Sequence, residues 1–388
     1  MTKSRSGVTV VDVLGVLDGL YPPQTAEDWD AVGLTCGDRS DPVRRVMFAV
    51  DPLPPVIDEA LEWDADLLIT HHPLLLRGVH SVAADTWKGR ALQRLIRGDC
   101  ALFTAHTNAD VASGGVNDAL AEALGLTDVE PLRPWPQGTT DKVVTFVPPS
   151  DAAKVIDAMA AAGGGTLGDY VRCAWSGTGT GTFTPQPGAN PTIGSVGSAE
   201  VLDESRVEML VPRQRRAAVL DALRSAHPYE EVAVDVYELA ELPSDTGLGR
   251  TGSLSTGQTL GDFAQRVAAA LPQTPAGVRV HGDLEQTIRR VAVCGGAGDS
   301  LLPDAVAAGV DAFMTADLRH HPASEHLASG GPALIDPGHW ASEWPWLPAS
   351  ATALVEGLRA QGHDPTTVET RVSSLVTDPV SAWLPGEG

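Results

Sequence analysis

Apolar residues occur in short runs that alternate with amphipathic segments along most of the chain. Runs such as 66–70 (DLLIT) and 100–105 (CALFTA) predict buried strands, because each is continuous and ends at polar residues. Segments 54–65 and 86–99 instead repeat apolar residues every three or four positions, which predicts helices. Strands and helices that alternate in this way favour an α/β fold with mixed, largely parallel sheets.

The same order of elements recurs near the far end of the chain. Segments 44–51 (RRVMFAVD) and 289–296 (RRVAVCGG) begin alike, and each is followed by a predicted helix and a second strand. The later elements of the second copy are helix 300–310, strand 311–317, helix 320–330 and strand 332–340. We interpret the two stretches as related α/β lobes.

The middle of the chain has a different texture. Two linkers rich in proline, glycine and polar residues, 131–142 and 240–250, enclose a smaller set of elements. These elements are strands 143–149, 205–212 and 231–239 and helices 151–163 and 213–228. Their order indicates an inserted α+β domain of the ferredoxin-like, split βαβ type. The predicted domains are therefore 1–130, 131–250 and 251–363, followed by a C-terminal tail at 364–388.

Histidines stand where the predicted strands end. His71 and His72 directly follow the first buried strand, and adjacent strand residues point to opposite faces. A plain core strand gains nothing from burying both rings, so the pair indicates either a surface loop or a metal or catalytic site. His106 and Asp110 follow the next strand. Parallel sheets bind ligands outside the carboxyl ends of their strands, where all these side chains fall.

A third strand end adds His339 and Glu343, within GHWASEW. If the chain turns helical there, the two side chains share one face and suit one metal ion; a solvated helix start is the alternative. Together the strand ends supply five or six donors with two carboxylates, more than one tetrahedral zinc requires. The set therefore predicts two metals, with Glu343 as a bridging ligand.

Composition narrows the class of protein. The 388 residues carry a formal net charge of −23, which repels phosphates and disfavours a broad nucleic-acid surface. The four cysteines form no CxxC pair, so neither a zinc ribbon nor a disulfide framework is expected. We find neither a secretory start nor an apolar run of roughly 18 residues, and expect a cytoplasmic protein without a membrane span.

Three further motifs favour structural roles. CGGAGDS (294–300) lacks the ending of a phosphate-binding P-loop, so it predicts a tight turn between a strand and a helix. SGTGTGTF (176–183) predicts a flexible hairpin more than an anion cradle. His227, Glu230 and Glu231 in HPYEE have no second donor cluster near them in sequence, which favours packing and a turn.

Five motifs occur in an order that resembles a known family. They are AEDWDAVGLTCGD (26–38), LLITHHPLLL (67–76), AHTNADVASGGVNDALAEALGL (105–126), VAVCGGAGDSLLPDAVAAGVDAFMTAD (291–317) and LIDPGHWASE (334–343). They resemble the GTP cyclohydrolase 1 type 2 homologs, which are Nif-three-like dinuclear-metal hexamer proteins. The middle of the chain resembles the insertion of longer members through GDYVRCAWSGTGTGTF (168–183), GANPTIG (188–194), AHPYEEVAVDVYEL (226–239) and GLGRTG (247–252).

The resemblance implies a particular ligand set. His71 and Asp110 serve one metal, His72 and His339 serve the other, and Glu343 bridges them. His106 then becomes a cavity residue that tunes ligands and substrate rather than a direct ligand. The resemblance also implies a homo-oligomer, a hexameric ring with the metal sites facing its cavity.

A further stretch of the resemblance concerns the wall of the cavity. Asp317, Arg319 and His321 match a family stretch of Asp, Lys and His that is expected to line it. The chain departs from the family at His320, where an aromatic residue is usual, and at Pro322, where an acid is usual. The cavity wall that faces substrate is therefore expected to differ from the family's pattern, whereas the expected metal ligands match it.

Two functions follow as hypotheses. The first is a metal-dependent hydrolase whose metal-bound hydroxide attacks GTP, another nucleotide or a phosphoester, with His106 or His321 as general acid. The second is a non-catalytic metal-binding regulator or metal-delivery protein, with the inserted domain as its sensory or docking surface. Imidazole and carboxylate ligands suit two divalent ions among Zn, Fe, Mn, Co and Ni.

Overall fold

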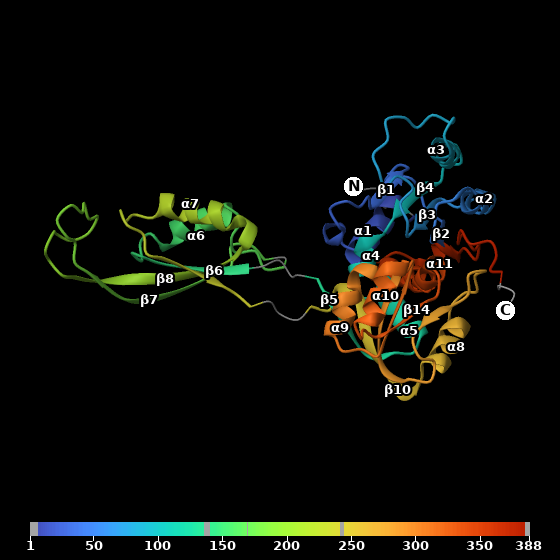
Figure 1. The fold of residues 1–388 in the computed structure, drawn as a ribbon. Helices are drawn as coiled ribbons and strands as arrows, with labels where there is room; N and C mark the ends of the chain where they lie inside the picture. Colours follow the sequence, from blue (N-terminus) through green and yellow to red (C-terminus); the bar gives the residue numbers. More distant parts are fainter. Residues whose placement is uncertain (1–6, 136–139, 169, 241–243, 385–388) are drawn as a thin grey trace. The chain divides into compact units, whose positions relative to one another are not determined.

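The computed structural model describes residues 7–135, 140–168, 170–240 and 244–384 (Figure 1). It is a mixed α/β protein with three sheets, and its contacts divide it into two compact units. One unit comprises Met1–Trp135 with Ser244–Gly388, and the other comprises Pro136–Pro243. The predicted linkers fall partly on 136–139 and 241–243, which lie outside the described residues.

The first sheet belongs to the N-terminal lobe and has the strand order β1-β4-β3-β2-β15. Three of its pairings are parallel, and only β1 runs antiparallel to its neighbour β4. Its strands are β1 (Gly33–Cys36), β2 (Arg45–Ala49), β3 (Leu67–Thr70), β4 (Ala101–Thr104) and β15 (Glu369–Val372). The chain end predicted as a tail thus contributes a strand beside β2, on the opposite side of β2 from β3.

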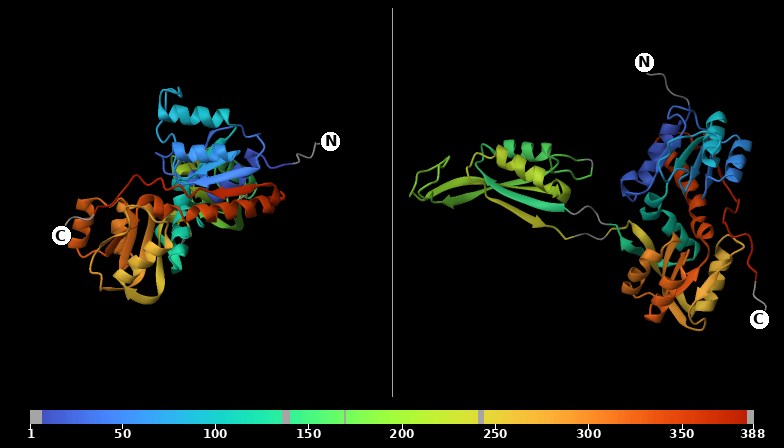
Figure 2. Two further views of the ribbon diagram at one scale, coloured as in Figure 1. Left: turned by 90° about the vertical axis from the view of Figure 1, so that its right-hand side faces the viewer. Right: turned by 45° about the horizontal axis from the view of Figure 1, so that its top comes forward.

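Helices cover both faces of this first sheet. On one face lie α2 (Pro54–Glu62) and α3 (Trp87–Arg97), with their own cluster of buried residues. The other face packs on α1 (Val10–Leu20) and the long α12 (Trp346–Ala360), while α5 (Val116–Ala123) contacts α12 and strands of the second sheet. Helix α12, orange-red in Figure 2, contacts α1, α5, β2 and β15, so a C-terminal helix completes the N-terminal lobe.

The second sheet belongs to the C-terminal lobe and has the order β11-β14-β13-β12-β10-β5. Only β12–β13 and β13–β14 are parallel, so the expectation of a largely parallel sheet holds for the first sheet alone. Its strands are β5 (Thr127–Pro134), β10 (Gly247–Thr259), β11 (Arg279–His281), β12 (Thr287–Ala297), β13 (Ala312–Ala316) and β14 (Ala333–Asp336). Helices α8 (Leu260–Ala270), α9 (Leu302–Ala307) and α10 (His320–Ala328) flank them.

The two lobes share one hydrogen-bond arrangement, in which an aspartate carboxylate accepts two backbone N–H groups. In the N-terminal lobe, at the start of strand β2, Asp66 accepts the N–H groups of Arg44 and Arg45, at 2.7 and 2.8 Å. In the other lobe Asp311 accepts those of Arg289 and Arg290, at 2.7 and 2.9 Å. An aspartate that precedes the next strand therefore fixes the entry of each RRV strand in the same way.

Both lobes are built around one continuous core, which fixes one against the other. Buried residues of β2, β3 and β4 belong to the same cluster as those of β12, β13 and β14. A buried ion pair adds to this contact: Arg250 on β10, 1% exposed, donates to both oxygens of Asp118 on α5 at 2.6 and 2.8 Å. Arg250 also donates to the carbonyl of Ala112, so breaking the pair would leave buried charge unmatched.

The second unit has a four-stranded antiparallel sheet in the order β7-β8-β6-β9. Along the chain the order is strand, helix, strand, strand, helix, strand. The elements are β6 (Thr140–Val147), α6 (Ala152–Ala161), β7 (Ala174–Phe183), β8 (Glu200–Pro212), α7 (Arg216–Ala226) and β9 (Val234–Glu238). Both helices pack on one face, around buried valines, leucine and methionines.

The glycine-threonine stretch in this unit is a strand, where the sequence predicted a flexible hairpin. Strand β7 pairs with β8 along its whole length, from Ala174 to Phe183. Its glycines stand on one face, where large side chains of β7 itself and of β8 lie close to Gly177 and Gly181. A Cβ on Gly177 would collide with the Trp175 ring, and one on Gly181 with the Glu204 carboxylate. The glycines therefore make room for neighbours instead of marking a loose loop.

The outer ends of the predicted linkers are strands as well. Residues 131–134 belong to β5 and residues 247–250 to β10, and the two pair with each other. The Trp135 N–H donates to the carbonyl of Thr246 at 2.8 Å, which brings the two ends of the insertion together. Among the helices that the structure describes, none is long and apolar enough to cross a membrane.

The pairing of β5 with β10 predicts that the first unit folds without the second. Replacing residues 136–243 with a short Gly/Ser linker should keep the first unit folded, because the linker only joins neighbouring ends. Circular dichroism and thermal unfolding measure this, with a deletion of 127–252, which removes β5 and part of β10, as the destabilised control. A product of the first deletion that unfolds like this control would show that the second unit is needed for folding.

Candidate metal centre

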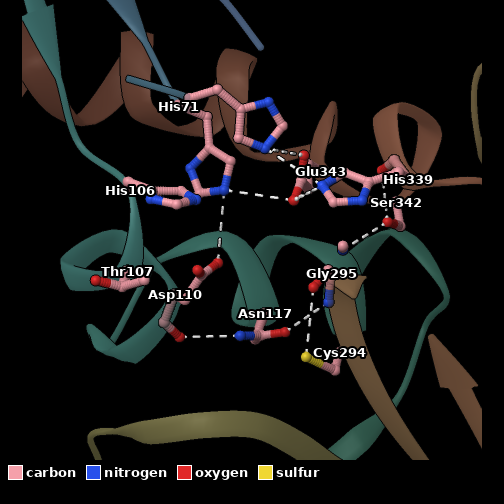
Figure 3. Close-up of polar contacts among 12 residues, drawn as sticks. His71, His106, Thr107, Asp110, Asn117, Cys294, Gly295, His339, Ser342 and Glu343 are labelled. Atoms are coloured by element: carbon pink, nitrogen blue, oxygen red, sulfur yellow. Dashed lines mark hydrogen bonds and ion pairs between the residues drawn. The ribbon is translucent and has the colours of Figure 1, made fainter. Parts of the chain in front are cut away.

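Polar side chains from both lobes meet where strands of the first unit end (Figure 3). His71 and His72 directly follow β3, and His106 caps the short helix α4 (Thr107–Val111) that follows β4. Asp110 lies on α4 and turns toward His71, at 3.7 Å from its Nε2. The carboxyl ends of parallel strands meet at one edge of a sheet, which is why residues far apart in sequence converge.

The C-terminal lobe supplies the remaining donors from one short helix. After β14 the chain forms α11 (His339–Glu343), so these two residues are four apart on one face, as the sequence predicted. The Glu343 side chain is 4% exposed and faces three imidazoles. Its Oε1 lies 3.0 Å from His339 Nε2 and 3.5 Å from His71 Nε2, and its Oε2 lies 3.3 Å from His72 Nε2.

Three buried polar atoms at this point make no hydrogen bond within the described residues. They are Nε2 of His71, Oδ1 of Asp110 and Oε2 of Glu343. Buried polar groups are normally paired, so unpaired atoms that face one another indicate a missing partner. Imidazole nitrogens and carboxylate oxygens are ligands for divalent transition metals. The residues present therefore fit a metal cation better than they fit one another.

The grouping of donors is compatible with more than one ion. Ligand atoms of His72, His339 and Glu343 lie within 4.8 Å of one another, and so do those of His71, His72 and His106. His72 Nε2 and His339 Nε2 are only 3.3 Å apart, although two neutral imidazole nitrogens gain little from such proximity unless one carries a proton. A cation between them removes this conflict.

Each histidine of the centre forms a hydrogen bond through its Nδ1 to a carboxylate or a carbonyl oxygen. His72 pairs with Asp51 at 2.7 Å, His339 with Asp317 at 2.7 Å, and His106 with Asp30 at 2.8 Å. His71 pairs with the backbone carbonyl of Ala105 at 3.0 Å. These partners favour a proton on Nδ1, which leaves the Nε2 lone pair directed at the centre.

The charges of the centre shift the pKa values of its groups. Burial by itself lowers the pKa of His72 and His339, but the Glu343 carboxylate and the hydrogen bonds to Asp51 and Asp317 raise them to about 10 and about 11. Burial also opposes ionisation of Glu343, yet His72, His339 and His71 hold its pKa well below its usual range. The centre is thus built to hold positive charge around one buried carboxylate.

Asn117 joins the lobes directly at the centre, and Ser342 supports the end of β12 within the C-terminal lobe. The amide of Asn117, fully buried, accepts the N–H of Gly295 at 2.9 Å and donates to the carbonyl of Asp110 at 2.9 Å (Figure 3). Ser342 accepts the N–H of Gly296 at 2.9 Å. Gly295 and Gly296, which the sequence placed in a tight turn, lie near the end of strand β12, and Glu343 packs against them.

Hollows open from the centre on two sides. A cavity of about 450 Å³ borders His106, Asp110 and Glu343 and extends to Trp29 and Arg133. The Trp29 side chain is 59% exposed, with its ring 5.9 Å from that of His106. A second cavity, of about 280 Å³, also borders His72 and His339 and is lined in part by the C-terminal segment 377–380.

The structure brings together the five predicted metal ligands and His106. The other catalytic candidate, His321, lies apart: it is exposed in the first turn of α10, with its ring beside that of His320, and it does not line the larger cavity. Asp317 reaches His339, whereas Arg319 pairs with Asp299.

Sequence reasoning missed several supporting residues. Asp51 and Asp30 were inside segments that it recognised, but not assigned a role. The position of Asp51 at the end of β2, beside the strand that carries the histidines, was the available signal. Asn117 and Gly296 had no chemical pattern that could have marked them. Thr377, which donates to Asp51 at 2.5 Å, lies in the predicted tail.

The fold and the centre together define a class: a mixed α/β protein with a histidine and carboxylate cluster between two lobes. The chain belongs to the Duf34/NIF3 (NGG1p interacting factor 3) family, whose model matches residues 8–379. It is 51% identical over 371 residues to a GTP cyclohydrolase 1 type 2 homolog of Mycobacterium leprae, covering 95% of this chain and 94% of that protein.

Other relatives agree over nearly the same length. A GTP cyclohydrolase 1 type 2 homolog of Bacillus subtilis is 39% identical, covering 88% of this chain and 90% of that one. Among solved structures, a Bacillus cereus protein related to NIF3 is 38% identical, with TM-score 0.67, covering 96% and 98% of the two chains. Staphylococcus aureus protein SA1388 is 29% identical, with TM-score 0.76, covering 97% and 99%.

The contact between Gly296 and Glu343 predicts a sharp effect of one methyl group. A Cβ on Gly296 would overlap Glu343 Oε1 and crowd His339 Nε2 at 3.1 Å. Gly296→Ala should therefore displace the carboxylate and lower affinity for added Co²⁺ about tenfold or more, measured by competition with a chelator.

Gly309→Ala is the matched control. Gly309 has φ +63° against +62° at Gly296, but its Cβ would meet nothing within 4 Å. Both variants carry the same backbone strain, of about 1 kcal/mol. Equal Co²⁺ affinity in the two variants would show that Glu343 does not need the space beside Gly296.

Proposed function

We propose that this chain is a dinuclear-metal-dependent hydrolase that acts on GTP or on another nucleotide or phosphoester. Two divalent ions are held by His71 with Asp110 and by His72 with His339, and Glu343 bridges them. The observation that carries the proposal is that three buried atoms at the centre, His71 Nε2, Asp110 Oδ1 and Glu343 Oε2, have no hydrogen-bond partner among the described residues. When bound, such a pair of ions supplies Lewis-acid polarisation of water and of the group under attack.

The chain's own residues supply the rest of the chemistry. Asp30, with its side chain fully buried and its pKa held low by His106 and Thr107 against the effect of burial, keeps His106 in one orientation. His106 borders the larger cavity and is the group placed to move a proton there. The cavity of about 450 Å³ is large enough for a nucleotide-sized molecule.

The smaller cavity favours a second candidate function, the storage or delivery of metal ions. The smaller cavity also borders His72 and His339, and its charged lining residues are Asp51, Asp317 and Asp378 with one cation, Arg279, which is paired with Asp336. Carboxylates along such an opening suit the passage of a cation. A protein that stores or delivers metal would use this opening and would show no turnover.

We infer two further points about architecture. The matching roles of Asp66 and Asp311 support an origin of the lobes by duplication, and the element order of the second unit supports an inserted ferredoxin-like domain. The protein assembles as a homo-oligomer, by similarity a hexamer. Light scattering across micromolar concentrations should give about six times the chain mass; a monomer or simple dimer would contradict this assembly.

Metal analysis tests the ligand set. Protein purified without a His tag should contain two divalent ions per chain. Glu343→Ala should lose most of both, because both ions share it, and His71→Ala should lose mainly one. His80→Ala, outside the centre, is the control. A full load of two ions in Glu343→Ala would disprove the bridge.

Turnover separates the two functions. The metal-loaded wild-type protein should convert GTP, a cyclic nucleotide or a phosphodiester, and the rate should fall with the metal content of the variants. His106→Gln should keep the metals and lose most of the rate, about a hundredfold or more for a lost proton-transfer group. Two tightly bound ions without turnover of any of these compounds would favour the delivery protein.

A further inference from the structure

Four segments of the second unit enclose one cavity of about 330 Å³. They are the end of β6, the end of β7 with the chain that follows it, β8 at Glu204, and the HPYEE segment after α7. Phe146, Phe183 and Tyr229 form aromatic walls, and the rings of Phe183 and Tyr229 are 6.3 Å apart at 58°. The motifs that resemble the family's insertion, GANPTIG and HPYEE, therefore meet around a hollow.

Hydrogen bonds hold the loops around this cavity in place. The N–H of Asn190 donates to Glu230 at 2.8 Å, and the hydroxyl of Thr192 donates to the carbonyl of Pro228 at 2.6 Å. His227 lies beneath them: its Nε2 pairs with the carbonyl of Phe146 at 3.0 Å, and its Nδ1 accepts the N–H of Tyr229 at 3.2 Å. His227 thus has the packing and turn role that the sequence predicted, and the cavity is preformed.

Carboxylates give the cavity its charge. Glu204, Glu230 and Glu231 line it, and among its described lining residues none is Lys or Arg. The nearest cation on the same strand, Arg206, donates to Glu208 at 2.9 Å. Glu204 instead accepts the hydroxyl of Tyr229 at 3.0 Å and lies across Gly181, where any Cβ would exclude it.

The Tyr229 phenol is held in its protonated form. Burial, and then the hydrogen bond to Glu204, raise the pKa of Tyr229 to about 12, so the phenol keeps its proton and donates it. The cavity therefore combines apolar walls with a carboxylate that has a hydrogen-bonded neighbour and, among the described residues, no ion-pair partner. The Arg206 guanidinium lies 5.9 Å from the centroid of the Phe146 ring, so the Phe183 and Tyr229 rings are the walls left for another cation.

We propose that this cavity binds a small organic cation with a flat apolar body, such as an aryl amidinium or guanidinium compound. The aromatic rings contact its flat body and attract its charge, and Glu204 pairs with its N–H groups. The volume suits a molecule of this size, and the acidic lining excludes phosphorylated compounds. The cavity lies within the second unit, so this proposal does not depend on the metal centre.

A matched series of ligands tests the charge. The full-length protein is titrated calorimetrically with benzamidine, its neutral analogue benzamide and the anion benzoate. Benzamidine should bind, benzamide should bind at least about tenfold more weakly, and benzoate should not bind, because a charged hydrogen bond is lost and then replaced by repulsion. Equal binding of benzamidine and benzamide, or no binding of benzamidine at millimolar concentrations, would overturn the proposal.

Variants place the binding in this cavity. Glu204→Gln should weaken benzamidine about tenfold while leaving benzamide unchanged, and Phe183→Ala should weaken both. Glu208→Gln is the control, since it lies on the same strand and its charge is already matched by Arg206 and Lys142. Glu343→Ala should leave benzamidine binding unchanged. If Glu343→Ala abolishes the binding and Glu204→Gln does not, the cation binds at the metal centre and the proposal is wrong.

Discussion

The carboxylate of Glu343 is buried among the rings of His71, His72 and His339, and the arrangement of the first unit follows from that one group. A buried carboxylate is costly unless positive charge lies beside it. The imidazoles that face it come from both lobes, two after β3 and one on its own helix, so the charge is matched only while the lobes stay together. The shared hydrophobic core and the contacts of Asn117 and Arg250 all cross this junction. Separating the lobes at this junction would therefore leave the Glu343 carboxylate without the imidazoles that match its charge.

The C-terminal part of the chain also helps to hold the residues around Glu343 in place. Helix α12 lies under the first sheet, and β15 extends that sheet beside β2. The segment that follows reaches back to the centre, where Thr377 donates to one oxygen of Asp51 and His72 pairs with the other. A hydroxyl near the chain end thus fixes a carboxylate, which fixes an imidazole. The orientation of His72 depends on residues more than three hundred positions later in the chain, a dependence that only a closed tertiary structure can supply.

The sequence predicted the donors because their chemistry and their spacing are local. His71 and His72 end a buried strand, and His339 with Glu343 has the spacing of one helical face, so short stretches were enough to place them. What it could not predict were partners that depend on tertiary contacts. Asp51 gains its role only because β2 lies beside β3, and β5 was taken for a linker because its partner β10 follows more than a hundred residues later. The glycines of β7 led to a wrong prediction for a related reason. Glycine-rich sequence suggested a flexible hairpin, whereas Gly177 and Gly181 leave space for the side chains of Trp175 and Glu204.

The carboxylates of the two units have different surroundings. In the first unit Glu343 is buried among imidazoles, and the donor atoms form two groups, each within 4.8 Å, which is compatible with a divalent metal ion. In the second unit Glu204 stands at the edge of an aromatic hollow, where donors are few and flat surface is plentiful. A bare metal ion gains little from such walls, because it would lose its water shell without gaining enough ligands, whereas an organic cation keeps its apolar body in contact with the rings. The second unit contributes none of the described residues of the candidate metal centre, so the two proposed sites share no side chain.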